Sequence, residues 1–164
     1  MALGERACEV TSKVVGDKHM LTLHAMANLG GIYALKGRYA EAEVLLNRSV
    51  ELAKRHFGQE HGVTVCCHMH LGILYRMQSR YEEHDAMFLD LLRTCRRSHG
   101  EDSMLADLAK RTLNWRVAKL SELGEEQTAG GDHKGAAATM VRLEEIRQAL
   151  RPSPERQADD DCDE

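Results

Sequence analysis

The fold of this chain is decided by residues 28–43, which read NLGGIYALKGRYAEAE. Before and within this stretch, apolar or small residues recur at steps of three and four, which marks one face of a helix. They are Leu23, Met26, Leu29, Gly30, Tyr33 and Ala34. Gly37 follows the last of them, where a glycine is suited to close a helix C-terminus. A second helical pattern starts from Tyr39 and stops at Gly58. The stretch therefore predicts two antiparallel helices joined by the short turn 36–38.

The same pattern returns 42 residues later. Laid over residues 58–99 without a gap, residues 16–57 show ten identities, among them Leu29-Gly30 with Leu71-Gly72. Glycines recur at the repeat boundaries, at positions 16, 58 and 100. Single helix pairs cannot bury both of their faces, so they stack on their neighbours. We therefore expect an all-α protein, a solenoid of antiparallel helix pairs with about seven helices.

The expected organisation is one helical repeat domain over residues 1–150, followed by a disordered acidic tail over 151–164. The domain would comprise a half repeat at 1–15, whole repeats at 16–57 and 58–99, and a degenerate cap at 100–150 with a loop near 124–131. By the 42-residue offset, residues 3–15 correspond to the second helix of a pair. We expect this helix to keep an apolar side without a first helix to cover it.

Composition and charge argue against several classes of function. The net charge of −4 gives no electrostatic reason to expect nucleic acid or an anionic membrane as partner. No apolar run approaches the roughly 20 residues that cross a bilayer. The five cysteines are an odd number in a chain without a secretion-type N-terminus, so we expect reduced thiols and a cytoplasmic location. Because no phosphate loop or catalytic spacing occurs, neither a cofactor nor enzymatic activity is expected.

Residues 28–43 resemble a tetratricopeptide repeat. The 42-residue spacing and the linker Phe57-Gly58-Gln59-Glu60-His61 are similar to those of kinesin light chains and nephrocystin-3-type proteins. The resemblance implies a protein-protein interaction scaffold, whose first helices line a concave face and bind a peptide or helix of a partner protein. Carried over residue by residue, it implicates in partner binding His24, Ala27, Asn28, Gly31, Cys66, Met69, His70, Ile73, Arg76, Arg111 and Trp115.

Two other hypotheses stay open at this point. In the first, the helix at residues 3–15 completes the core of another copy and the protein is a homo-oligomer. In the second, the chain is a small metal-binding protein that uses Cys66 and His70, which lie one helical turn apart and are ligand types that zinc prefers. A structural zinc site needs four ligands, and His24 or His61 would be the natural additions.

Overall fold

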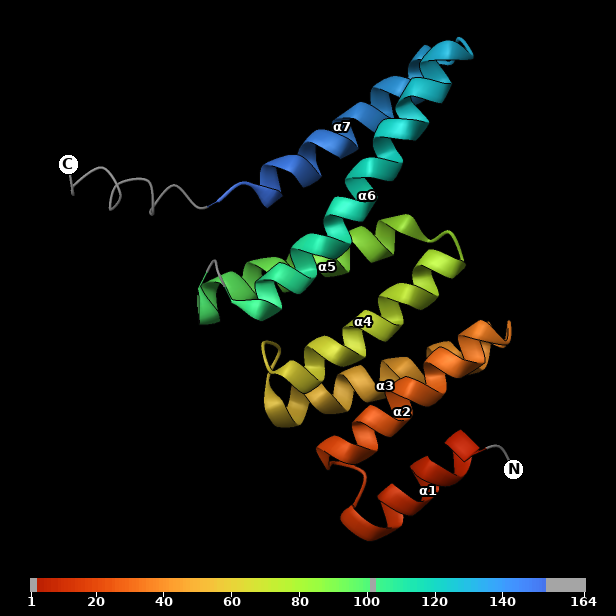
Figure 1. The fold of residues 1–164 in the computed structure, drawn as a ribbon, viewed down its shortest axis with the longest axis vertical. Helices are drawn as coiled ribbons and strands as arrows, with labels where there is room; N and C mark the ends of the chain where they lie inside the picture. Colours follow the sequence, from red (N-terminus) through yellow and green to blue (C-terminus); the bar gives the residue numbers. More distant parts are fainter. Residues whose placement is uncertain (1–2, 101–102, 153–164) are drawn as a thin grey trace, which may run out of the picture. The chain divides into compact units, whose positions relative to one another are not determined.

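The chain folds into α-helices, as predicted. The computed structural model describes residues 3–100 and 103–152, and this part of the chain contains no strand. Its helices are α1 (Leu3–Val15), α2 (Met20–Leu35), α3 (Tyr39–Phe57), α4 (Gly62–Met77), α5 (Tyr81–His99), α6 (Met104–Ala129) and α7 (His133–Leu150) (Figure 1). None of the helices in this part combines the length and apolar character of a membrane-spanning segment.

The chain divides into two compact units, residues 1–87 and 88–164, and α5 spans the boundary. We refer to them as unit 1 and unit 2. That one domain covers residues 1–150 stays a prediction. The helical part ends at Leu150, and residues 153–164 of the predicted acidic tail lie outside the described residues.

In unit 1, α2 and α3 form the predicted antiparallel pair. The turn between them spans residues 36–38, and Gly37 takes a left-handed φ of 73° there. The two helices approach each other tightly at Gly30, where an added Cβ would lie only 2.5 Å from Leu46 Cγ. A residue without a side chain is therefore required at this crossing.

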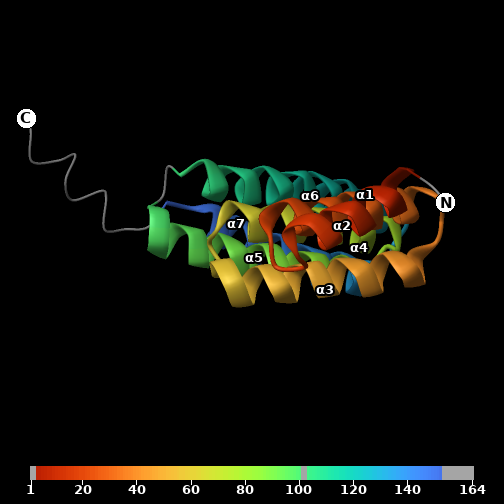
Figure 2. The same ribbon diagram turned by 90° about the horizontal axis from the view of Figure 1, so that it is seen from below.

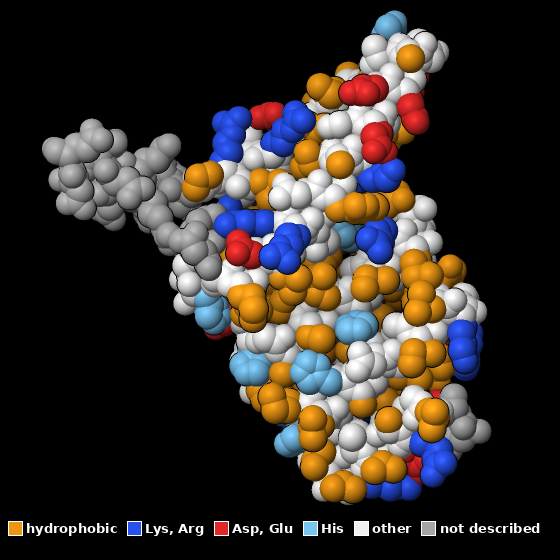
Figure 3. Space-filling model, in the orientation of Figure 1, with side chains coloured by type: hydrophobic (Ala, Val, Ile, Leu, Met, Phe, Trp, Pro, Cys, Tyr) orange, Lys and Arg blue, Asp and Glu red, His pale blue; other side chains and the backbone are white. Residues whose placement is uncertain are grey.

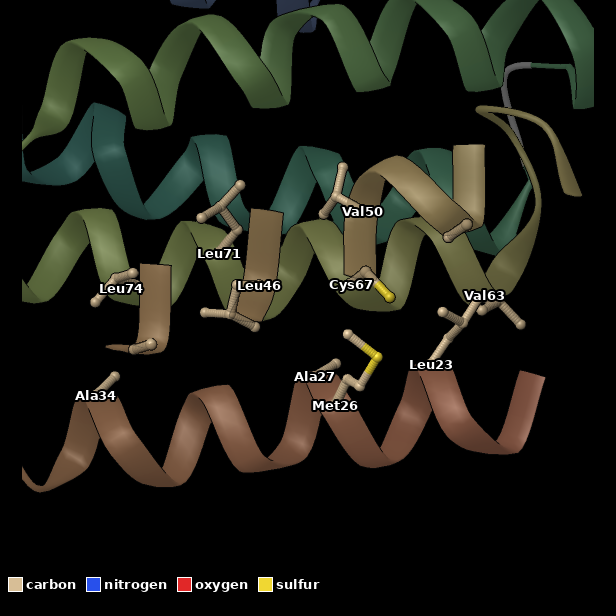
Figure 4. Packing of buried hydrophobic residues seen from close by; sticks show 12 residues of the cluster. Leu23, Met26, Ala27, Ala34, Leu46, Val50, Val63, Cys67, Leu71 and Leu74 are labelled. Carbon is tan, nitrogen blue, oxygen red and sulfur yellow. The ribbon is translucent and has the colours of Figure 1, made fainter. Parts of the chain in front are cut away.

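The next helix, α4, packs on both members of this pair. Figure 2 shows α3 on one side of α2 and α4, and Figure 4 shows the apolar side chains between them. The buried cluster draws on all three helices and consists of Leu23, Met26, Ala27, Ala34, Ala42, Leu46, Val50, Ala53, Val63, Cys67, Leu71 and Leu74. A single helix pair leaves one apolar side of α2 and α3 uncovered, and the packing of α4 on the pair buries that side.

The connectors that lead into α2 and α4 are built alike. Thr64 Oγ1 donates a hydrogen bond of 2.7 Å to the carbonyl of Gly58, and His61 Nδ1 accepts one of 3.2 Å from the amide of Val63. Forty-two residues earlier, Thr22 and His19 make the same bonds with the same lengths. The histidine therefore caps the helix N-terminus while the threonine fixes the boundary glycine.

A second repeated device follows the first helix of each pair. The guanidinium carbon of Arg38 lies 4.2 Å from the ring centre of Tyr33, and that of Arg80 lies 4.5 Å from the ring centre of Tyr75. In the second turn Ser79 replaces the glycine, yet it takes the same left-handed conformation, with a φ of 59°. The backbone geometry of the turn is thus kept without its glycine.

Unit 2 contains the hairpin of α6 and α7, and it corrects the predicted loop near 124–131. The first helix is lengthened as expected, but it continues to Ala129, so that the turn comprises only residues 130–132. Gly124 is a buried residue inside α6, so it does not end the helix. An added Cβ there would be 3.6 Å from Met140 Sδ of α7, which is an ordinary contact.

Candidate functional site

The residues implicated in unit 1 lie on the two first helices, α2 and α4. On α2, Asn28 is exposed and His24 is half-buried, and the two are one helical turn apart. On α4, Ile73 and Arg76 are exposed, whereas Met69 is half-buried. We call this surface the first-helix face and define it by His24, Asn28, Leu35, Cys66, Met69, His70, Ile73 and Arg76.

His70 joins the two helices of this face. Its Nδ1 donates a hydrogen bond of 3.0 Å to the carbonyl of Cys66, because a carbonyl oxygen can only accept. Its ring lies against Gly31 of α2, where an added Cβ would be 3.0 Å from His70 Cδ2. The imidazole is therefore held in place, and in the neutral ring Nε2 is an acceptor.

The chemical character of the face is mixed. Figure 3 shows hydrophobic and histidine side chains gathered over α2 and α4, with few acidic side chains among them. The amide of Asn28 and the guanidinium of Arg76 add hydrogen-bond donors. Such a surface is able to bury apolar side chains of a partner and to bond its backbone.

The structure changes the predicted set in two places. Ala27 is fully buried in the core of unit 1 and is therefore not part of any binding surface. Leu35, which sequence reasoning did not select, is 75% exposed at the end of α2. Its position gave a usable signal, because it lies seven residues after Asn28 and four after Gly31, on the same helical stripe.

Arg111 and Trp115 belong to α6 in unit 2. Arg111 is exposed, Trp115 is half-buried, and the two are one helical turn apart. Their participation in partner binding stays a prediction.

The thiols of Cys66 and Cys67 on α4 are not activated for nucleophilic chemistry. Burial raises the pKa of the Cys66 thiol, and it raises the pKa of Cys67 to about 11. Both thiols are therefore protonated near neutral pH and are poor nucleophiles. Within residues 3–100 and 103–152, no three His, Cys, Asp or Glu side chains come together as a metal-binding group. The metal hypothesis on Cys66 and His70 is thus not favoured.

Two surface depressions were not anticipated from the sequence. One, of about 460 Å³, lies in unit 1 over α2 and α3 and is lined by Leu29, Tyr33, Ala40, Glu41, Val44, Leu45 and Arg48. The other, of about 580 Å³, lies in unit 2 over α6 and α7 and includes Gly124, Met140 and Leu143. Both are mainly apolar.

Comparison with known families agrees with this architecture. One tetratricopeptide repeat model matches residues 2–55 and 25–83, and a second model of the same description matches residues 69–103. The matches identify the repeat and do not single out the kinesin light chain type. No curated protein matches the chain. Matches over half of the chain, together with the packing of α4 on the pair α2–α3 in unit 1, show that this protein belongs to the tetratricopeptide repeat family.

Proposed function

We propose that the chain binds a partner protein through the first-helix face, which receives an extended peptide or a helix of that partner. Tetratricopeptide repeats generally mediate protein-protein interactions, so the general function of this chain is to bind another protein. The first-helix face is proposed as the binding site because Leu35 and Ile73 form an exposed apolar surface on α2 and α4, beside hydrogen-bonding side chains.

The contacts of this face suit a peptide ligand. A partner side chain that covers Leu35 would remove apolar surface from water and contribute about 1–2 kcal/mol. Nε2 of His70, whose Nδ1 bonds the carbonyl of Cys66, can accept a hydrogen bond from a peptide backbone, and the amide of Asn28 can donate and accept such bonds. Because the imidazole is already ordered, little conformational entropy is lost when the partner binds.

In unit 2, we include Arg111 and Trp115 in the same function, since Trp and Arg are the residue types that dominate binding energies at protein interfaces. The binding site requires neither a cofactor nor a catalytic group. An odd number of cysteines in the sequence favours a reducing compartment, the cytoplasm, as the place of binding.

The test compares two exposed aliphatic residues on opposite sides of unit 1. Leu35 on the first-helix face is 75% exposed, and Val44 on α3 is 72% exposed. A photo-crosslinking amino acid at position 73 first identifies the bound partner by mass spectrometry. Binding of that purified partner is then measured by isothermal titration calorimetry to the wild-type chain, to Leu35→Asp and to Val44→Asp.

We expect Leu35→Asp to weaken binding about tenfold or more, because it places a charge in an apolar contact. Val44→Asp should leave the affinity unchanged, and both variants should keep the circular dichroism of the wild type. Loss of binding in Val44→Asp alone would move the interface to the depression over α2 and α3. Retained binding in both variants would refute the first-helix face as the site.

A further inference from the structure

The charges of this chain are divided unevenly between its helices and residues 153–164. These residues hold six carboxylates and one arginine, which gives them a net charge of −5. Because the whole chain has a net charge of −4, all residues before position 153 together have a net charge of +1. Most of the carboxylates are concentrated in residues 159–164, which read DDDCDE and which we call the acidic run. A run of this kind favours contact with a basic surface.

The C-terminus of α7 is fastened to α5 within unit 2. Arg96 of α5 donates hydrogen bonds to the carbonyls of Ala149, Leu150 and Arg151, and the bond to Arg151 is 3.1 Å long. The last carbonyls of a helix lack partners inside it, so the guanidinium caps the C-terminus of α7. The chain therefore reaches Pro152 beside the C-terminal half of α5.

A further surface depression, of about 510 Å³, lies next to this contact. It is lined from α5 by Leu89, Leu92 and Arg93, and from α7 by residues that include Arg142 and Ala149. Leu89 and Leu92 are buried, whereas Arg93 is exposed. The depression thus combines apolar side chains with arginines, in the unit from which the acidic run extends.

Arg93 and Arg97 of α5 are available to bind carboxylates. Both are exposed, and neither has a hydrogen bond or an ion pair with a residue that the structure describes. They are four residues apart on one side of the helix, which separates them by about 6 Å along its axis. The guanidinium of Arg142 differs, because it donates a hydrogen bond of 2.8 Å to Glu145, which also lines the depression. The uncompensated positive charge is therefore that of α5.

We propose that the acidic run binds in this depression and places two of its carboxylates on Arg93 and Arg97. In an extended segment, side chains two residues apart point the same way and lie roughly 6.6 Å apart. Asp161 and Asp163 therefore match the spacing of the two arginines. Guanidinium and carboxylate groups pair well, because two parallel hydrogen bonds can form between them.

The connection between α7 and the acidic run is long enough for this contact. Residues 153–158 span at most about 20 Å when extended, and the depression begins at Ala149, three residues before Pro152. So short a connection keeps the effective concentration of the run at the depression in the millimolar range. Exposed ion pairs that are weak by themselves are then sufficient for binding.

The proposal adds a binding site to the prediction of a disordered tail. Disorder is expected of residues 153–164 because they hold too few apolar side chains to form a core. A basic depression on the same chain can order them without a core. Bound there, the acidic run covers Arg93 and Arg97 and withholds them from acidic segments of other proteins.

The test measures the backbone order of the acidic run by NMR in the full chain labelled with ¹⁵N. The order parameter S² is about 0.85 for a rigid backbone and below about 0.6 for a flexible one. At low ionic strength, we expect the amides of Asp161 and Asp163 to have S² above about 0.6 in the wild type. In Arg93→Glu, S² should fall below that value, because the new carboxylate repels the run. High salt should have the same effect on the wild type, since exposed ion pairs are screened.

The matched control is Lys134→Glu, near the start of α7. Lys134 is exposed like Arg93, and its replacement changes the net charge equally, so an unspecific attraction would respond to both variants. It lies about 24 Å along the helix from Leu150, at the opposite end of α7 from the depression. Lys134→Glu should therefore leave S² of the acidic run unchanged.

A reversal of the charges tests the pairing itself. The double variant Arg93→Glu with Arg97→Glu should lose the order of the run. Adding Asp161→Arg and Asp163→Arg should restore it, because each pair is formed again with opposite signs. Circular dichroism establishes that every variant keeps its helices.

Four results would overturn the proposal. An S² below about 0.6 in the wild type at low ionic strength would show that the run is not bound. An equal loss in Arg93→Glu and Lys134→Glu would reduce the contact to unspecific attraction, and a reversed variant without order would exclude the pairing. An S² that rises with protein concentration would show that the run binds a second copy. The proposal does not rest on the first-helix face, so the affinity of Leu35→Asp for its partner is a separate question.

Discussion

Replacing Gly30 by alanine tests whether the crossing of α2 and α3 sets the stability of unit 1. The added Cβ would lie 2.5 Å from Leu46 Cγ and 2.7 Å from its Cδ2, well inside van der Waals contact. Leu46 is fully buried, and Cγ is not a flexible end that swings aside. Overpacking of this kind costs about 1–3 kcal/mol. The helix propensity of alanine over glycine returns about 1 kcal/mol.

The clash involves the branch point of a core leucine, so the cost lies in the upper part of its range. We therefore expect Gly30→Ala to lower the free energy of unfolding by about 1–2 kcal/mol. The matched control is Gly124→Ala in α6, whose Cβ would lie 3.6 Å from Met140 Sδ, an ordinary contact. That variant gains helix propensity without a clash, and its stability should rise by about 1 kcal/mol.

The assay is urea unfolding followed by circular dichroism and by tryptophan fluorescence. The only tryptophan, Trp115, lies in unit 2, so its fluorescence reports on that unit while circular dichroism reports on both. Gly30→Ala should lower the midpoint seen by circular dichroism. If Gly30→Ala is as stable as the wild type, the close crossing does not constrain this position and the reasoning is wrong. Combining it with Leu46→Ala should be less than additive, because the second change removes the clashing atoms.

Three further predictions concern the connectors and turns. Thr64→Val removes the hydroxyl that bonds the Gly58 carbonyl and should cost about 1 kcal/mol, seen as a lower urea midpoint; an unchanged midpoint would contradict this role. Ser79→Gly relieves a left-handed backbone that costs a non-glycine residue about 1 kcal/mol, and should raise the melting temperature, whereas a lower one would refute the argument. The hydrogen bond from Arg80 lowers the pKa of Glu83 in the folded state below the usual value of 4.5. At acidic pH the unfolded chain therefore binds more protons than the folded chain, and the free energy of unfolding falls as the pH drops through the folded pKa. In Arg80→Leu, urea midpoints measured from neutral pH downward should show a weaker dependence on acid, and an unaltered dependence would exclude this ion pair as its source.

The helix pair of residues 20–57 was predictable because its signals are local. The spacing of apolar residues shows the buried side of each helix, and Gly37 and Gly58 mark the ends, so no knowledge of neighbouring elements is needed. The loop near 124–131 was predicted to begin too early, because a glycine inside a helix and a glycine that ends one look the same in sequence.

The first-helix face was predictable only in part. The helical stripe placed Asn28 and Ile73 on the surface, as the structure shows. Ala27 could not be assigned from one sequence, because its exposure depends on where α4 crosses α2.

The connector at residues 58–64 bears on how such a chain changes in length. The carbonyl of Gly58, the capping imidazole of His61 and the hydroxyl of Thr64 all come from this one segment, so the connector is inherited together with the repeat that follows it. A duplication or deletion of 42 residues that begins at a boundary glycine would leave such a connector whole. Its hydrogen-bond donors and acceptors would stay together without a compensating substitution, so arrays of different length could arise in a single genetic step.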